Sequence, residues 1–470
     1  MSRRRKKKDQ IISGLSVESI AAEGKSVARH DNQVIFIKEA VPGDIVDVRI
    51  TRKKKTYSEG VPVHYHQYSD QRVEPFCDHF GTCGGCKWQH LNYTSQLGYK
   101  QQQVIDNLSR IGQVDTSCIA PILAAKKTRL YRNKLEFTFS NKRWLTKEEI
   151  DSEKQLERNA LGFHIPGLFD KIVDVDKCHL MEEPMNAIKN EFRKYALEHH
   201  LEFFDIRDQV GLLRNLMIRQ TDHGEIMVLV QFYEDDQDKI QALLEHIKSK
   251  FPAITSFLYV INGKKNDTFQ DLPVHVFHGK DHIIEKMGDL QFRIGPKSFY
   301  QTNSAQAKEL YDIVVEFADL RGAELVYDLY TGTGTIANYI ASKCQKVIGL
   351  EYVEDAIQDA FSNSELNQIN NTDFYAGDIK DLLDDEFVDK HGQPDVVITD
   401  PPRAGMHTDV VNMLLKCAPE KMVYVSCNPA TQARDLALMK EAYDVVKIQP
   451  VDMFPHTHHT ECVVLLELRK

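Results

Sequence analysis

One ten-residue segment, Asp328–Ala337, constrains the fold of this chain more than any other. It reads Asp-Leu-Tyr-Thr-Gly-Thr-Gly-Thr-Ile-Ala and lies between a predicted strand, Leu325–Leu329, and a predicted helix. Gly332 and Gly334, with alanine at the third position, are typical of a tight turn where the backbone approaches a nucleotide. Glu351 ends the next predicted strand, where a carboxylate can bind both ribose hydroxyls. The pattern predicts a nucleotide-binding α/β fold.

Short apolar runs alternate with helical segments from about residue 305 to the C-terminus. This alternation is typical of a parallel α/β sheet with helices between its strands. We therefore expect a doubly wound sheet whose ligands bind at the carboxyl ends of the strands. The further predicted strands are Lys346–Leu350, Asp395–Thr399, Met422–Ser426 and Cys462–Glu467.

Two further strand ends favour S-adenosylmethionine (SAM) over a nicotinamide nucleotide, which would bind a similar glycine loop. Asp378 follows Gly377 after another predicted strand, as expected of a contact near an adenine. Asp400 begins the sequence Asp-Pro-Pro-Arg after a buried strand. A strand-terminal Asp-Pro-Pro resembles the motif that methyltransferases place beside SAM and a flat nucleobase. A nicotinamide oxidoreductase would leave this motif unexplained.

Cys427 and Glu461 are the candidate catalytic pair. Cys427 ends a strand at the expected ligand edge, and Glu461 precedes the last strand. A cysteine, a carboxylate and SAM together suit methylation at carbon 5 of a pyrimidine, in which a thiolate adds at carbon 6 and a base removes the carbon 5 proton. We expect local positive potential to lower the pKa of Cys427. A zinc site is an alternative use of the loop histidines, His456, His458 and His459.

Cys77, Cys83 and Cys86 form a second pattern, Cys-x5-Cys-x2-Cys. The glycines between Cys83 and Cys86 allow both thiolates to bind the same metal centre. Cys178 is the expected fourth ligand. Spacing alone leaves zinc and an iron–sulfur cluster equally open. The total of nine cysteines is odd, which argues for ligands and nucleophiles over a disulfide framework.

The first 60 residues are basic, whereas the whole chain is acidic. They carry 14 Lys and Arg against 8 Asp and Glu, a net of +6, although the whole chain has a net charge of −10. The basic clusters Arg3–Lys8 and Arg52–Lys55 are either phosphate contacts or solvated segments. Alternating stretches between residues 10 and 67 predict a small barrel of the OB type. The segment Gly14–Val27, followed by Val-Pro-Gly-Asp at 41–44, resembles a TRAM domain, an RNA-binding barrel.

The middle of the chain has a mixed α+β pattern. Amphipathic helices are predicted at Met185–His199 and Asp238–Phe251, with strands at Tyr131–Ser140 and Glu225–Phe232. Residues 142–158 are charged and predict a loop or an exposed helix.

The motifs together resemble, in order and spacing, the RNA uracil-5 methyltransferase family, and the likeness covers nearly the whole chain. The resemblance implies that Cys427 is the nucleophile and Glu461 the base. It also implies a [4Fe-4S] cluster on the four cysteines. The TRAM-like barrel and the cysteine pattern resemble the 23S ribosomal RNA branch more than the tRNA branch. The residues that the resemblance implies for SAM or substrate are Gln301, Tyr330, Glu351 and Asp400, with Phe299 near the flipped base. Gly332, Gly334 and Asp378 are cofactor candidates from the strand-end pattern. Arg132 is a candidate RNA contact, with a structural salt bridge as the alternative.

We therefore expect a class I (Rossmann-like) methyltransferase with three parts. These are a basic tail and barrel (1–67), a central iron–sulfur and RNA-binding domain (68–290) and a SAM domain (291–470). A helix at about 95–112 would pack on the SAM domain.

The alternatives are a tRNA uridine methyltransferase and an RNA-binding protein with an inactive methyltransferase domain. The intact Cys427 and Glu461 disfavour the second of these. A radical-SAM enzyme would need a Cys-x3-Cys-x2-Cys loop that the sequence lacks. No membrane helix or secretion signal is predicted, so we expect a cytoplasmic monomer.

Overall fold

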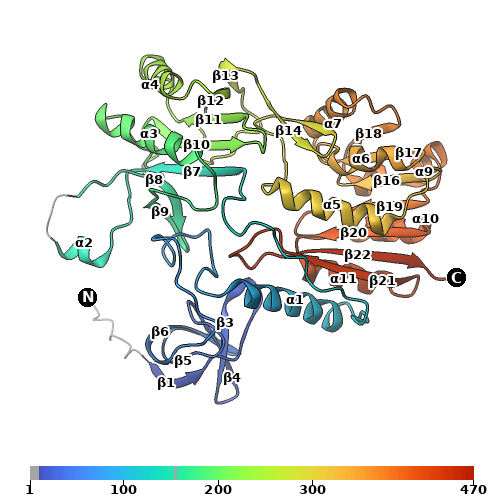
Figure 1. Cartoon of the computed structure of the whole chain (residues 1–470), viewed down its shortest axis with the longest axis horizontal. Helices are drawn as coiled ribbons and strands as arrows, with labels where there is room; N and C mark the ends of the chain where they lie inside the picture. Colours follow the sequence, from blue (N-terminus) through green and yellow to red (C-terminus); the bar gives the residue numbers. More distant parts are fainter. Residues whose placement is uncertain (1–9, 153–155) are drawn as a thin grey trace, which may run out of the picture.

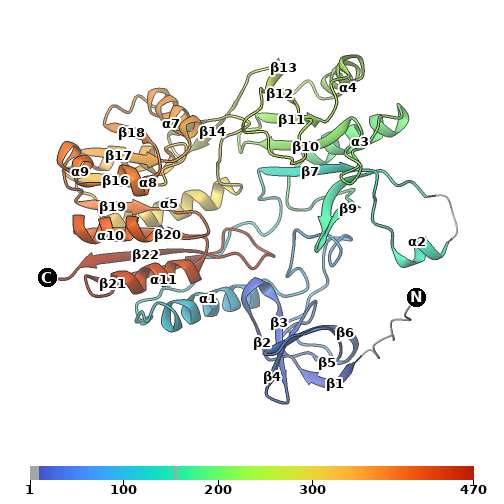
Figure 2. The same cartoon turned by 180° about the vertical axis from the view of Figure 1, so that it is seen from behind.

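The computed structural model describes residues 10–152 and 156–470, so the basic run Arg3–Lys8 lies outside the described residues. Three main sheets follow one another along the chain. The N-terminal barrel and the central sheet lie at opposite ends of one side, and the C-terminal sheet lies beside both (Figures 1 and 2). None of the described helices combines the length and the hydropathy of a membrane span.

The N-terminal sheet closes around a small apolar core and confirms the predicted barrel. Alternate residues of its strands point inward, and Val46 and Val48 are fully buried on β5. The strand order is β1-β5-β6-β4-β3-β2. The strands are β1 (Ile11–Ser16), β2 (Ser19–Ile20), β3 (Ser26–His30), β4 (Gln33–Ile37), β5 (Ile45–Lys53) and β6 (Tyr57–Gln67), with a 3₁₀ turn, η1 (Ala22–Gly24).

The central sheet has the order β13-β12-β11-β10-β7-β8-β9 and is covered on one face by α3 and α4. The predicted helices at 185–199 and 238–251 are these two. The charged segment at 142–158 contains a short helix, α2, with a capping box formed by Thr146 and Glu149. The elements are β7 (Lys134–Ser140), α2 (Lys147–Asp151), β8 (Ala160–Ile165), β9 (Leu168–Asp174), α3 (Met185–Glu198), β10 (Leu213–Gln220), β11 (Ile226–Phe232), α4 (Gln237–Lys250), β12 (Ile254–Ile261) and β13 (His275–Gly279).

The other face of the central sheet shares a core with the C-terminal part of the chain. Met217, Met227 and Leu229 pack in one cluster with residues of the hairpin β14 (Ile283–Met287) and β15 (Leu290–Ile294). Met287 pairs with Leu290 in this hairpin, so the expected boundary between residues 290 and 291 falls inside it. The division into domains stays a prediction.

The C-terminal sheet has the order β18-β17-β16-β19-β20-β22-β21, in which strands β16 to β20 are parallel. The order reverses between β16 and β19, which is where open α/β sheets bind their ligands. The strands are β16 (Leu325–Leu329), β17 (Lys346–Glu351), β18 (Thr372–Ala376), β19 (Val396–Thr399), β20 (Lys421–Ser426), β21 (Tyr443–Val451) and β22 (Glu461–Leu468).

Helices cover both faces of this sheet. One face packs against α5, α6 and α7, and the other against α1, α8, α9, α10 and α11. Helix α1 comes from before the central sheet, and its Val104 and Leu108 pack in the same core as Ala433 and Leu436 of α11. The helices are α1 (Tyr93–Arg110), α5 (Ser304–Ala318), α6 (Thr335–Ile340), η2 (Ala341–Lys343), α7 (Glu354–Leu366), α8 (Ile379–Leu382), α9 (Asp385–His391), α10 (Thr408–Cys417) and α11 (Pro429–Met439).

The direction of the last strand differs from the sequence prediction. We expected Cys462–Glu467 to join a parallel sheet, but β22 runs antiparallel to both β20 and β21. The physical reason is the connection, because only residues 452–460 link β21 to β22, and a parallel pair needs a crossover of about a dozen residues or more. Strand β21 itself was not predicted.

Candidate functional site

The glycine loop after β16 adopts a bent conformation that requires its glycines. Gly332 and Gly334 have φ angles of 55° and 72°, in the left-handed region. A Cβ added at Gly334 would lie 2.9 Å from the Cβ of Ala360. The N–H of Gly332 donates a hydrogen bond of 3.1 Å to Oε2 of Glu351 at the end of β17. The structure therefore brings the loop and its predicted acid together.

Tyr330 and Asp378 lie at the same edge of the sheet. Tyr330 is half-buried in the glycine loop and has a φ of 63°. The N–H of Gly377 donates to the carbonyl oxygen of Glu351 at 2.8 Å, and Asp378 then caps α8 by accepting the N–H of Lys380. Glu351, at the end of β17, is thus hydrogen-bonded both to the glycine loop and to the segment of Gly377 and Asp378.

Cys427 directly follows β20, and Glu461 is the first residue of the antiparallel strand β22. In the register of β20 and β22, Ser426 pairs with Cys462, so the next position places Cys427 opposite Glu461. Directly opposed residues of an antiparallel pair have Cβ atoms about 4.5–5.5 Å apart. A parallel β22 would have placed Glu461 at the other edge of the sheet. The direction of β22 is therefore what joins the candidate nucleophile to the candidate base.

The pKa values of this pair are raised, which corrects the expectation of a lowered pKa for Cys427. Burial and the nearby carboxyl groups of Glu461 and Asp400 raise the pKa of the Cys427 thiol to about 11, although Arg403 acts in the opposite direction. Burial and Asp400 raise the pKa of Glu461 to about 8, against the effects of Arg403 and Lys100. The negative potential of two carboxyl groups outweighs the one guanidinium.

The buried acids along this edge suit a cationic ligand. Burial raises the pKa of Asp328 and of Asp400 to about 7 each. Oδ2 of Asp328 accepts the hydroxyl of Thr331 and the N–H of Ala337, whereas Oδ1 has no partner among the described residues. A sulfonium ion beside these carboxyl groups would offset the cost of ionising them. The residues present therefore fit SAM.

Gln301, Phe299 and Arg132 come from segments outside the sheet. The carbonyl oxygen of Gln301 accepts a hydrogen bond of 3.0 Å from Nδ2 of Asn133, next to Arg132. Phe299 is 71% exposed. The guanidinium of Arg132 lies 5.8 Å from the ring centroid of Phe454, and its backbone N–H donates to Leu180. The linker at 132–133 thus touches the segment that carries Gln301.

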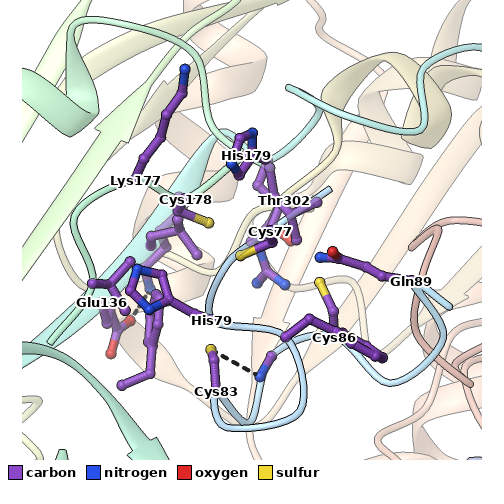
Figure 3. A pocket seen from close by; sticks show the side chains of 18 residues that line it. Cys77, His79, Cys83, Cys86, Gln89, Glu136, Lys177, Cys178, His179 and Thr302 are labelled. Carbon is purple, nitrogen blue, oxygen red and sulfur yellow. Dashed lines mark hydrogen bonds and ion pairs between the residues drawn. The ribbon is translucent and has the colours of Figure 1, made fainter. Parts of the chain in front are cut away.

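The four predicted ligand cysteines line one cavity of about 340 Å³. Figure 3 shows the sulfur atoms of Cys77, Cys83, Cys86 and Cys178 turned toward a common space. Burial, together with the neighbouring thiols, raises the pKa of Cys83 to about 11 and of Cys86 to about 12. The donor set and the space fit a sulfur-ligated centre.

No group of three or more His, Cys, Asp or Glu side chains in residues 10–152 and 156–470 is arranged to hold a metal ion, and this includes the four cysteines, whose thiols stand around the cavity without converging on one point. The zinc alternative at His456, His458 and His459 therefore gains no support. The rings of His458 and His459 pack on each other at 4.2 Å, and the ring of His456 lies 5.0 Å from that of Phe76.

A buried ion pair that was not predicted from the sequence lies behind the site. Nζ of Lys100 on α1 lies 2.6 Å from Oδ1 of Asp452, and both side chains are fully buried. Lys100 lowers the pKa of Glu461 as well. The helical spacing could have indicated that Lys100 is buried. Lys100 is four residues from Val104 and eight from Leu108, so it lies on the same buried face of α1.

Comparisons with known proteins identify the family of the chain. A family model described as tRNA (Uracil-5-)-methyltransferase matches residues 221–469, and a TRAM domain model matches residues 12–63. An RNA methyltransferase of Bacteroides thetaiotaomicron is 57% identical over 96% of this chain and 100% of its own length. Another, of Porphyromonas gingivalis, is 54% identical over 96% of this chain and 99% of its own. The chain belongs to the RNA uracil-5 methyltransferase family.

A solved structure supports the same assignment. The tRNA (uracil-54, C5)-methyltransferase of Pyrococcus abyssi, in complex with S-adenosyl-L-homocysteine, has a TM-score of 0.75 and 28% identity, covering 97% of this chain and 100% of that chain. The protein is thus a SAM-dependent RNA uracil-5 methyltransferase with a class I fold and an N-terminal TRAM domain. RNA is its partner.

The coupling between Glu461 and Cys427 predicts how fast the thiol reacts. Alkylation requires the thiolate, and the charge of Glu461 raises the thiol pKa whereas that of Arg403 lowers it. At pH 8, iodoacetamide should modify Cys427 several-fold faster in Glu461→Gln and more slowly in Arg403→Ala. Peptide mass spectrometry measures both rates, with Cys118 in the same digest as the control. Equal rates at Cys427 in all three proteins would show that these groups do not face the thiol.

Proposed function

We propose that this enzyme methylates carbon 5 of one specific uridine in 23S ribosomal RNA. The family supplies the reaction class, and the choice of ribosomal RNA is our inference from the joint presence of a TRAM domain and the cysteine pattern. The observation that supports the mechanism is the register of β20 and β22, in which Ser426 pairs with Cys462, so that Cys427 follows one partner and Glu461 precedes the other.

The reaction needs both side chains because carbon 5 of uracil is a weak nucleophile. Cys427 gives its proton to solvent, and its thiolate adds to carbon 6, which leaves an enolate with negative charge on carbon 5. Carbon 5 takes the methyl group that SAM would supply. Glu461 then removes the proton that remains on carbon 5, and the electron pair of that bond restores the double bond between carbons 5 and 6 as the thiolate of Cys427 leaves. A base whose pKa is about 8 is close to the working range for this proton transfer.

SAM supplies the electrophilic methyl group when it is bound. We infer that Glu351 binds the ribose hydroxyls and that the backbone of Gly332 and Gly334 lies against the nucleotide, as their geometry allows. We propose that Asp378 contacts the adenine and that Asp400 lies beside the reacting ends of the cofactor and the base. Gln301 and Tyr330 are proposed to complete the pocket.

The target uridine must leave the RNA stack to reach Cys427. We propose that Phe299, whose ring is exposed, packs on the flipped base, and that Arg132 contacts the RNA backbone. The two residues lie on connected segments, because Asn133, next to Arg132, donates a hydrogen bond to the carbonyl oxygen of Gln301, two residues after Phe299.

The cysteine cavity is proposed to hold a [4Fe-4S] cluster on Cys77, Cys83, Cys86 and Cys178. A zinc ion would draw four sulfur atoms to about 2.3 Å from one point, whereas a cluster with a Cys₄ donor set occupies more space. The cavity of about 340 Å³ that the four thiols help to line has room for the larger group. No step of the methyl transfer needs an electron, so its role here is structural.

A tRNA is the second candidate substrate. The Pyrococcus abyssi enzyme is described as acting on uracil 54 of tRNA, and its structure covers 97% of this chain. The overall architecture is therefore compatible with either RNA.

Labelled SAM and two RNA pools distinguish these substrates. We expect 5-methyluridine in ribosomal RNA from a strain that lacks the enzyme, identified by nucleoside mass, and none in bulk tRNA from that strain. Cys427→Ala should lower methyl transfer by about 10⁴-fold or more while SAM affinity stays within about twofold. Methylation of tRNA alone would replace ribosomal RNA by the second candidate, and an active Cys427→Ala protein would exclude the covalent mechanism.

Metal analysis tests the cysteine centre. Protein purified without oxygen should contain about four iron atoms and four sulfide ions per chain and show broad visible absorption. Cys83→Ser should lose iron, whereas Cys118→Ser should keep it, because Cys118 lies outside the cavity. About one zinc atom per chain in place of iron would contradict the proposal.

A further inference from the structure

A second cavity, of about 570 Å³, lies where the TRAM barrel meets the segment that carries the cysteines. This volume is within the usual range of small-ligand sites. Tyr65 at the end of β6, Tyr68, Arg72, Phe80 and His90 line it. None of these residues belongs to the glycine loop or to the Cys427–Glu461 pair.

Two stacked tyrosines form one wall of this cavity. The rings of Tyr65 and Tyr68 are 4.8 Å apart and inclined by 20°, and the guanidinium of Arg72 lies 4.9 Å and 5.5 Å from their centroids. Asp44 holds Arg72 through two hydrogen bonds of 2.9 and 2.7 Å. Tyr68 is nevertheless 63% exposed, so the platform is fixed in place with much of one ring open to solvent.

A second aromatic pair faces the same cavity from the cysteine segment. The rings of Phe80 and His90 are 5.1 Å apart. Flat aromatic walls of this kind stack nucleobases of unpaired RNA, because every base has a π face.

The charges around the cavity favour a base over a phosphate. The one cation, Arg72, is already paired with the buried Asp44, while the exposed side chains of Glu39 and Glu74 also line the cavity. Carboxylates repel phosphate, but they accept hydrogen bonds from exocyclic amino groups of bases.

We propose that this pocket binds an unpaired nucleobase of the RNA substrate other than the target uridine, with preference for a base that carries an amino group over uracil. The proposal rests on the RNA methyltransferase function. The cysteine segment also reaches the catalytic loop, because the N–H groups of Lys87 and Trp88 donate to the carbonyl oxygen of His456 at 2.8 and 3.1 Å. A nucleotide in the pocket is thus bound to the same segment that contacts the loop before Glu461.

Fluorescence anisotropy with labelled eight-nucleotide oligoadenylate and oligouridylate tests this pocket in the full chain. Wild-type protein should bind oligoadenylate more tightly than oligouridylate. Tyr68→Ala should weaken oligoadenylate binding by about five- to 150-fold, the range expected for one lost base stack. Tyr68→Phe keeps the ring and should stay within about twofold of wild type. SAM affinity should be the same in all three proteins.

Equal oligoadenylate affinity in wild type and Tyr68→Ala would overturn the proposal, as would a Tyr68-dependent affinity for a proline-rich peptide but not for RNA. If Tyr68→Ala lost affinity for SAM as well as for oligoadenylate, the proposal would also be overturned, because the substitution would then have disturbed the whole protein and not one base contact. Methyl transfer to ribosomal RNA tests the proposed function independently. Wild-type protein that binds oligoadenylate through Tyr68 but leaves ribosomal RNA unmethylated would keep the pocket and remove the proposed function.

Discussion

The buried ion pair between Lys100 and Asp452 fixes the loop on which the catalytic geometry depends. The hydroxyl of Tyr93 donates to the second oxygen of Asp452 at 2.8 Å, and Lys100 also donates to the carbonyl oxygen of Phe454 at 3.1 Å. Breaking a buried pair by removing one partner typically costs about 3–5 kcal/mol, since the remaining charge is left uncompensated. Residues 452–460 therefore have one strongly favoured arrangement, and they lead directly into Glu461.

The same loop is fastened from the cysteine segment and from the linker before the central sheet. The backbone N–H groups of Lys87 and Trp88 both donate to the carbonyl oxygen of His456, whose own N–H donates to Oε1 of Gln96 at 2.9 Å. The hydroxyl of Tyr131 donates to the carbonyl oxygen of the proline before His456 at 3.0 Å. The proposed centre on the cysteine segment would therefore also shape the approach to Glu461, a structural role that suits a reaction without electron transfer.

Local patterns predicted the parts of the site whose signals are themselves local. The glycine loop and the strand-terminal Asp400 follow from turn chemistry and apolar periodicity, and the structure places both at one sheet edge. The direction of β22 could not be predicted in that way, because a buried strand has the same apolar run in either direction. Strand β21 carries Pro450 and two charged residues, Asp444 and Lys447, that hide its apolar pattern. The role of Lys100 was missed because a lysine is usually exposed. The raised pKa of Cys427 comes from burial first and then from carboxyl groups brought from other strands, so its sign is a property of the folded chain.

The central claim is that one sulfur atom bonds to the target base and that the opposed carboxyl group allows its release. The most direct measurement is mass spectrometry of the Glu461→Gln protein after incubation with SAM and its RNA, followed by nuclease and protease digestion. The account predicts a peptide in which Cys427 is joined to a methylated uridine nucleotide, abundant in Glu461→Gln and scarce in wild type. A methylated RNA product with no such peptide, or an adduct on another residue, would contradict it.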